Sequence, residues 1–194
     1  MSDPSSYRGI YLIGALAKLF EGFLVRRLTT YTEAHNTLTD NQFGSRPGRQ
    51  IHDAIYTLLS IIHFNKHCQK KPTYVAFIDY TTAYPSVFRE GLSYELFKQG
   101  IRGKMWRHLR ERFGKISVRV LHPLIPDTSY VDVKRGLPEG SRLSPILFGI
   151  VAADLIRELR TEFPNASIQT PGLTGAQSVR SHAPSCTIWA GGFC

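Results

Sequence analysis

Asp79 occupies a position in this sequence that suits metal chemistry. It lies within residues 73–80, an apolar run that predicts a buried β-strand, and Tyr84 follows five residues later. A carboxylate at the end of a strand can hold a hard cation, because the strand fixes its position while the strand end leaves room for a substrate. A solvated or capping aspartate is the ordinary alternative at such a position.

A second stretch, residues 135–148, reads RGLPEGSRLSPILF and joins a tight turn to a helix. Two glycines flank its proline and let the backbone approach a ligand closely, while Ser141 and Ser144 can cap the helix. Exposed amides at a helix start suit phosphates or sugars. No Gly-Lys-Ser or Gly-Lys-Thr follows, so the stretch does not predict a nucleotide-triphosphatase loop. A plain turn before a helix explains it equally well.

Two further groups of basic residues could bind phosphate. Arg46 and Arg49 flank a Pro-Gly turn in NQFGSRPGRQIHDAI, and guanidinium groups match phosphate geometry better than ammonium groups do. Residues 102–119 carry seven basic side chains and one acid, with Trp106 and Phe113 interleaved. The seven are Arg102, Lys104, Arg107, Arg110, Arg112, Lys115 and Arg119. They predict either a surface that follows a nucleic-acid backbone or a solvated helix face.

The elements that must position these residues are mixed helices and strands. Apolar residues at three- and four-residue steps predict helices over residues 10–31, 51–62, 87–99, 104–113 and 146–162. In the first helix the predicted apolar face contains Ile13, Leu16, Phe20, Leu24 and Leu28, which leaves Glu21 for another face. Strands are predicted at residues 73–80, 116–122 and 128–135, with a proline-rich turn between the last two. Helices mixed with hairpins favour an α+β fold.

Composition limits the kind of protein further. The chain has 194 residues, 42% of them hydrophobic, which suffices for one domain or part of one with a real core. Its net charge of +9 suggests a polyanionic partner such as nucleic acid or an anionic membrane, although solubility alone also explains it. No long apolar window and no secretory signal is visible, so we expect an intracellular protein, nuclear or cytoplasmic, that does not span a membrane.

The cysteines and histidines do not indicate a metal centre. Cys68, Cys186 and Cys194 are odd in number and far apart, which favours reduced thiols. His63, His67 and Cys68 could share a helix face as ligands, but without a fourth ligand nearby a solvated helix end is preferred.

Taken in order, these stretches resemble the reverse transcriptases, most closely those of non-LTR (LINE-like) retrotransposons. The segment YRGIYLIGALAKLFEGFLVRRL is similar to the family's opening segment and DNQFGSRPGRQIHDAI to its fingers motif. VAFIDYTTAYPSV is similar to the first palm motif and GLPEGSRLSPILFGI to the second. The resemblance covers residues 7–163 and implies the fingers and a partial palm of a right-hand polymerase. It also implies an RNA template, a DNA primer, deoxynucleoside triphosphates and two Mg²⁺ ions as ligands.

The resemblance assigns roles to the candidate residues. Asp79 matches the first catalytic, metal-binding aspartate, and Tyr84 matches the aromatic residue that lies under the sugar and excludes a 2′-hydroxyl. The nucleotide and template pocket would be lined by Pro138, Glu139, Gly140 and Ser141. Arg46 and Arg49 match the fingers region that meets template and triphosphate. Glu139 departs from the family's usual glutamine, and a negative side chain there would repel a triphosphate unless protonated or paired.

The resemblance also divides the chain. It predicts a helical fingers region over residues 1–70, a partial palm over 71–168, an irregular insertion over 169–186, and a strand beginning at 187 that leads toward a Tyr-x-Asp-Asp hairpin. That hairpin does not occur among the 194 residues, which contain no adjacent aspartate pair. We therefore expect the chain as given to be an incomplete, inactive polymerase domain. A non-catalytic nucleic-acid-binding module and a decayed element fragment are the alternatives.

Overall fold

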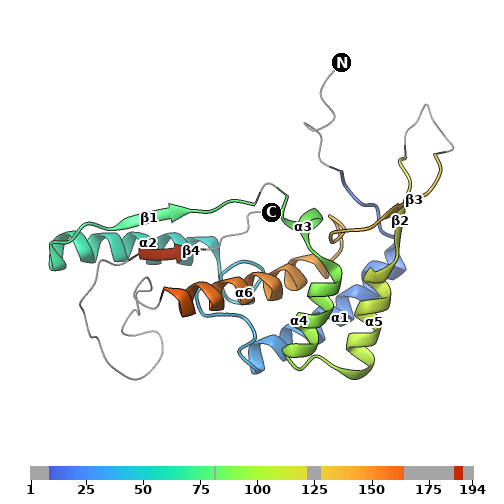
Figure 1. The fold of residues 1–194 in the computed structure, drawn as a ribbon, viewed down its shortest axis with the longest axis horizontal. Coiled ribbons are helices and arrows are strands. Elements are labelled where there is room, and N and C mark those ends of the chain that lie inside the picture. Colours follow the sequence, from blue (N-terminus) through green and yellow to red (C-terminus); the bar gives the residue numbers. More distant parts are fainter. Residues whose placement is uncertain (1–8, 81, 122–127, 164–185, 190–194) are drawn as a thin grey trace, which may run out of the picture. The chain divides into compact units, whose positions relative to one another are not determined.

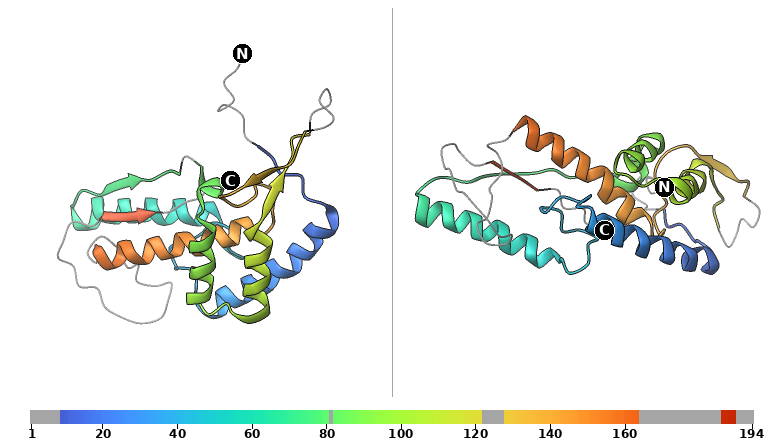
Figure 2. Two further views of the ribbon diagram at one scale, coloured as in Figure 1. Left: turned by 45° about the vertical axis from the view of Figure 1, so that its right-hand side comes forward. Right: turned by 90° about the horizontal axis from the view of Figure 1, so that it is seen from below.

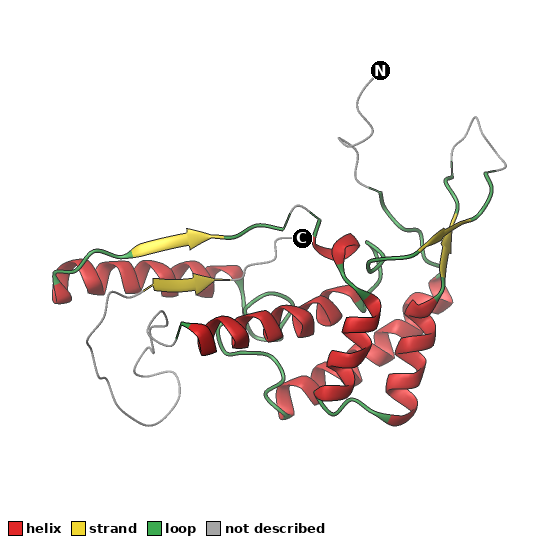
Figure 3. Ribbon diagram, viewed as in Figure 1, coloured by secondary structure: helices red, strands yellow, loops and turns green. Residues whose placement is uncertain are grey.

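The computed structural model describes residues 9–80, 82–121, 128–163 and 186–189 (Figure 1). The chain divides into two compact units, each made of two separated segments. The first unit comprises Met1–Thr37 and Thr81–Val151, and the second comprises Leu38–Tyr80 and Ala152–Cys194. Helices are mixed with short strands along the chain, which is compatible with the predicted α+β class (Figure 3). The boundaries between fingers, palm and insertion stay a prediction.

The first unit is mainly helical. Its elements are α1 (Ala15–Ala34), α3 (Ala83–Ser86), α4 (Arg89–Lys98), α5 (Gly103–Gly114), β2 (Ile116–Val118), β3 (Val131–Val133) and the start of α6 (Ser144–Glu162). Helices α4 and α5 pack against each other, and β2 pairs with β3 in an antiparallel hairpin (Figure 2). Large apolar side chains from four of the helices are fully buried and form the core of this unit: Leu28, Leu96, Leu109, Leu147 and Ile150.

Helix α1 begins later than its sequence predicts and buries only part of the predicted face, Leu24 and Leu28. Residues 9–14 are not helical, and within this segment the Tyr11 N–H donates to the Glu139 carbonyl at 2.9 Å. The buried positions of α1 are Glu21, Leu24, Leu28 and Thr32, whereas Leu16 is 84% exposed and Phe20 is also exposed. The prediction that Glu21 faces away from the apolar stripe was therefore wrong.

The second unit contains α2 (Ile51–Phe64), the π-helical turn η2 (Asn65–Gln69), β1 (Tyr74–Phe77), β4 (Cys186–Trp189) and the end of α6. Helix α2 begins where the sequence predicts, since Gln50 and Asp53 form a capping box at its first turn. Strand β1 pairs with β4 in parallel, with Tyr74 opposite Cys186. The strand is shorter than predicted, and Phe77 is 82% exposed, so the expectation of a buried strand was wrong.

Some predicted features fall outside the described residues. They include nearly all of the predicted insertion, the end of the last predicted strand and the turn at 123–127. Among the helices that the structure describes, none combines the length and the apolar character that a membrane span requires.

Candidate nucleotide and nucleic-acid site

The first unit brings Tyr84 next to the glycine-rich turn that precedes α6. The Leu137 N–H donates to the Tyr84 carbonyl at 2.8 Å, and the Tyr84 ring meets the Phe148 ring edge-on at 5.6 Å between centroids. Gly136 donates its N–H to Val87 and has φ +83°, where a Cβ atom would lie 2.6 Å from the Pro85 backbone. Only glycine fits this approach, which fixes the turn against the segment that carries Tyr84.

Arg89 holds the strand end that leads into this turn. It is the first residue of α4 and is 6% exposed. Its Nε donates to the Gly136 carbonyl at 2.7 Å, and its two terminal nitrogens donate to the carbonyls of Val133 and Arg135 at 2.7 and 2.9 Å. Desolvation by burial lowers the pKa of the Arg89 guanidinium, and the charges of Tyr11 and Glu90 counteract this in part. The carbonyl oxygens thus replace the water that the buried cation has lost.

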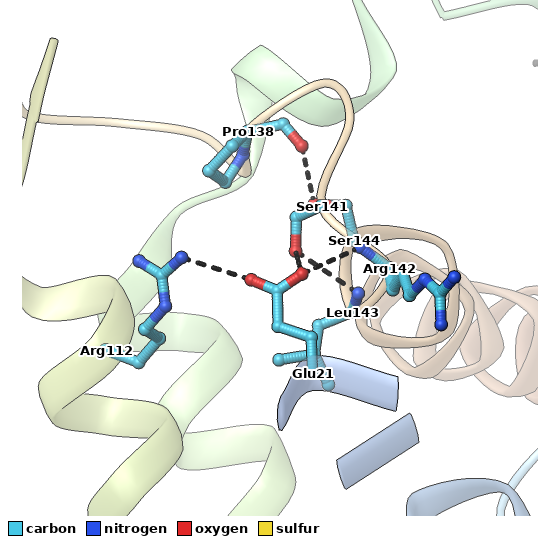
Figure 4. Close-up of polar contacts among 7 residues, drawn as sticks. All are labelled: Glu21, Arg112, Pro138, Ser141, Arg142, Leu143 and Ser144. Carbon is cyan, nitrogen blue, oxygen red and sulfur yellow. Dashed lines mark hydrogen bonds and ion pairs between the residues drawn. The ribbon is translucent and has the colours of Figure 1, made fainter. Parts of the chain in front are cut away.

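Glu21 also contacts the turn, through the hydrogen bonds drawn in Figure 4. Its Oε2 accepts hydrogen bonds from the Ser141 hydroxyl at 3.0 Å and from the Arg142 N–H at 2.9 Å. Its Oε1 lies 3.1 Å from Nη2 of Arg112 on α5. The Glu21 side chain is 2% exposed and the Arg112 side chain 31% exposed, so the carboxylate is buried while its cationic partner reaches solvent.

The four residues predicted to line a nucleotide pocket, Pro138 to Ser141, lie together on this turn. The Pro138 carbonyl accepts from the Ser144 hydroxyl at 2.8 Å, and Ser141 is buried with its hydroxyl also accepting the Leu143 N–H at 3.2 Å. Gly140 is exposed with φ +111°, and a Cβ atom there would lie 2.7 Å from the Tyr11 carbonyl oxygen. Glu139 is partly buried. The Ser141 side chain therefore takes part in the hydrogen bonds of the turn itself, whereas Gly140 is exposed.

Asp79 lies in the second unit, two residues beyond the end of β1, and its side chain is exposed. The sequence predicts Asp79 as part of the strand, whereas β1 ends at Phe77, so Asp79 follows the strand. Among the described residues, no group of three or more His, Cys, Asp and Glu side chains could hold a metal ion. A single carboxylate does not make a complete Mg²⁺ site, although Mg²⁺ can be held by one or two carboxylates together with substrate phosphates.

Arg46 and Arg49, in the second unit, fold back onto their own turn. Arg46 donates to the carbonyls of Thr39 and Gln42 at 2.8 and 3.4 Å. Arg49 donates to the Asp40 backbone carbonyl and lies 3.5 Å from the Asp40 carboxylate. Both guanidinium groups are partly buried, and each helps to shape the turn that precedes α2.

The basic cluster on and on either side of α5, which spans Gly103–Gly114, is mostly exposed. Six members point to solvent: Arg102, Lys104, Arg107, Arg110, Lys115 and Arg119. Arg102 lies over the Phe97 ring at 4.6 Å and Arg110 over the Trp106 ring at 5.2 Å, contacts that limit the freedom of long side chains. Arg112 is the exception, because its guanidinium pairs with Glu21. We call the six exposed residues the α5 basic surface.

Comparison with known proteins defines the family. The family described as reverse transcriptase (RNA-dependent DNA polymerase) matches residues 2–177, which is most of the chain, so this protein belongs to the reverse transcriptase family. It is 31% identical over 160 residues to a probable RNA-directed DNA polymerase from transposon BS of Drosophila melanogaster. It is 28% identical over 161 residues to a probable RNA-directed DNA polymerase from transposon X-element of the same species.

A more distant relative extends the comparison beyond flies. The chain is 23% identical over 176 residues to a retrovirus-related Pol polyprotein from type-1 retrotransposable element R2 of Popillia japonica. These alignments cover 79%, 79% and 90% of this chain but 17%, 16% and 23% of the respective relatives. The chain therefore spans about a sixth to a quarter of the relatives' length and is a reverse transcriptase domain of the non-LTR retrotransposon type.

Sequence reasoning missed the residues that support the turn. The signal for Glu21 was present, because positions 21, 24, 28 and 32 repeat at helical spacing, but an acid was not expected on a buried face. Arg89 gave no signal, since its partners are backbone carbonyls more than forty residues away. Arg112 was predicted to bind nucleic acid, and its pairing with Glu21 gives it a structural task as well.

Proposed function

We propose that this chain forms the fingers and part of the palm of an RNA-directed DNA polymerase of a non-LTR retrotransposon. The observation that carries the proposal is the match to the reverse transcriptase family over residues 2–177. The proposed substrates are an RNA template paired with a DNA primer, and deoxynucleoside triphosphates. The α5 basic surface would contribute to the binding of the nucleic-acid backbone.

The proposed nucleotide pocket combines the turn before α6 with Tyr84. Tyr84 would lie under the sugar of the incoming nucleotide, and the backbone at Glu139 and Gly140 would line its base and sugar. The hydrogen bond between Leu137 and Tyr84 supports this pairing, because it joins the two motifs within one compact unit. Arg46 and Arg49 would meet the template or triphosphate if they exchanged their present carbonyl contacts for phosphate.

Asp79 is proposed as a metal ligand and catalytic residue. The reverse transcriptase family uses divalent metal ions, and Mg²⁺ bound beside Asp79 would stabilise the charge of the transferring phosphates. The 194 residues contain no adjacent aspartate pair. Since the loss of one preorganised electrostatic group costs about 10²- to 10³-fold in rate, we expect this chain alone not to extend a primer.

The experiment measures binding of a fluorescent RNA–DNA primer–template by anisotropy. We expect binding that weakens with salt and that the next complementary dNTP, added with Mg²⁺, strengthens, whereas a mismatched dNTP does not. Asp79→Asn should abolish the dNTP effect and leave binding without nucleotide unchanged, because Asp79 is exposed and packs against no core. Primer extension by the chain, lost in Asp79→Ala, would contradict the expectation of inactivity.

A second candidate function is nucleic-acid binding without catalysis. The exposed α5 basic surface favours it, because phosphate binding needs only that surface. The same titration separates the two functions. Salt-dependent binding that no dNTP alters would support the binding module, and equal affinity for the primer–template and for blunt duplex DNA would count against a polymerase.

A further inference from the structure

We propose that Glu21 is a positioning residue for the nucleotide pocket, holding the turn of residues 138–143 in the shape that presents its backbone to a nucleotide. This inference rests on the proposed function, since it assigns that turn to nucleotide binding. Glu21 lies on α1, more than a hundred residues before the turn in sequence, yet it makes the contacts that organise it (Figure 4).

One carboxylate oxygen of Glu21 fixes the backbone just before α6. Its Oε2 accepts from both the Ser141 hydroxyl and the Arg142 N–H. Ser141 in turn accepts the Leu143 N–H at 3.2 Å, so the hydroxyl is oriented by Glu21 and holds a second amide. The Glu21 carboxylate thus accepts the Arg142 amide directly and orients the hydroxyl that accepts the Leu143 amide.

Arg112 and Tyr11 make the remaining contacts that fix Glu21 and the turn. Arg112 holds Oε1, which sets the plane of the carboxylate and offsets the cost of burying its charge. Within the turn, the Glu139 carbonyl accepts a hydrogen bond from the Tyr11 N–H at 2.9 Å. The Tyr11 carbonyl leaves no room for a side chain at Gly140. The turn is therefore held between α1 and the segment that precedes α1.

The chemistry of Glu21 favours positioning over stability. A well-packed hydrophobic residue in place of a buried ion pair is often as stable or more stable. A buried carboxylate that also binds a hydroxyl and a backbone amide instead fixes one arrangement of the turn, because a hydrophobic residue has no acceptor for either donor.

Two substitutions of Glu21 distinguish its ion pair with Arg112 from its hydrogen bonds to Ser141 and Arg142. Glu21→Gln keeps one acceptor oxygen, and we expect it to face the turn, since Arg112 reaches solvent and the donors of the turn are less accessible. Glu21→Met has a similar volume and no acceptor at either position. Leu28→Ala is the control, because Leu28 is fully buried on the same helix and its side chain makes none of these hydrogen bonds.

Hydrogen exchange and dNTP-dependent primer–template binding are measured on the full chain, under conditions where each variant is folded. Hydrogen exchange should be faster in Glu21→Met by about tenfold or more at the Arg142 and Leu143 amides, roughly the effect of one lost charged hydrogen bond. The concentration of complementary dNTP that half-saturates its effect on primer–template binding should rise by a similar factor of about ten. Glu21→Gln should stay within about threefold of the wild type in both, because it retains a neutral hydrogen bond.

Leu28→Ala should lower the free energy of unfolding. When it is compared with the wild type at the same fraction of folded protein, amide exchange at Arg142 and Leu143 and the half-saturating dNTP concentration should not change. The inference is overturned if Glu21→Met behaves like Leu28→Ala, or if Glu21→Gln and Glu21→Met are equally impaired, which would indicate an ion pair alone. A wild-type chain that binds primer–template but ignores dNTP would contradict the proposed function. Amide exchange needs no nucleotide and would then decide by itself whether Glu21 holds the turn.

Discussion

Replacement of Arg89 tests whether the turn depends on support from α4. Arg89→Met removes three hydrogen bonds from a buried cation to the carbonyls of Val133, Arg135 and Gly136, and leaves these oxygens without that donor. Each buried polar group that loses its partner costs about 1–3 kcal/mol, and removal of the buried cation offsets part of this. We expect a loss of about 3–5 kcal/mol in the free energy of unfolding, a large share of the about 5–15 kcal/mol of a typical domain.

Urea denaturation and hydrogen exchange measure this effect. Arg89→Lys replaces three donor nitrogens with one and should fall between wild type and Arg89→Met, so it reports a partial loss even if the methionine variant does not fold. Hydrogen exchange should accelerate at the Gly136 and Leu137 amides. These amides donate to the carbonyls of Val87 and Tyr84, next to the carbonyls that Arg89 binds. Arg107→Met, an exposed substitution on α5, should stay within about 0.5 kcal/mol. Equal stability of Arg89→Met and Arg107→Met would refute the reasoning.

Three further results are expected. Gly140→Ala should lower the melting temperature and weaken the dNTP effect, because φ is +111° and the new Cβ would lie 2.7 Å from the Tyr11 carbonyl oxygen; unchanged melting would contradict this. Tyr31→Phe should cost about 1 kcal/mol in urea denaturation, since its hydroxyl donates to the carbonyl that ends α4 at 3.0 Å. Arg107→Gln should reduce the salt slope of duplex DNA binding by about 0.9 if it contacts one phosphate, whereas Arg112→Gln should leave the slope unchanged.

Local sequence patterns predicted the elements but not every boundary. Helix α2 begins at the predicted residue, and α5 matches within a residue at each end, because periodicity and capping are local properties. Residues 10–14 were predicted as helix but precede α1, and the Tyr11 backbone bonds to Glu139 instead. No periodic pattern reports a partner that lies more than a hundred residues away.

The sequence supplied candidate residues for the site but not the side chains that contact the turn before α6. Resemblance located Tyr84 and the turn before α6, and the structure joins them through the Leu137 amide. Glu21 and Arg89 could not be assigned from sequence, because a charge on an amphipathic helix ordinarily faces solvent. Their burial depends on tertiary partners, which are Arg112 and the turn for Glu21 and three backbone carbonyls for Arg89.

The basic residues on and beside α5 lie in two different surroundings. Those of the α5 basic surface face water, where ammonium and guanidinium groups remain solvated and exchangeable, as phosphate binding with release of counterions requires. Arg112 instead faces a carboxylate that is 2% exposed, and removal of its charge would leave Glu21 buried without a cation. Arg112→Gln should therefore act through the turn and its nucleotide, and Arg107→Gln through salt-dependent affinity. The two effects separate only if the helix binds nucleic acid on one face and supports the pocket with the other.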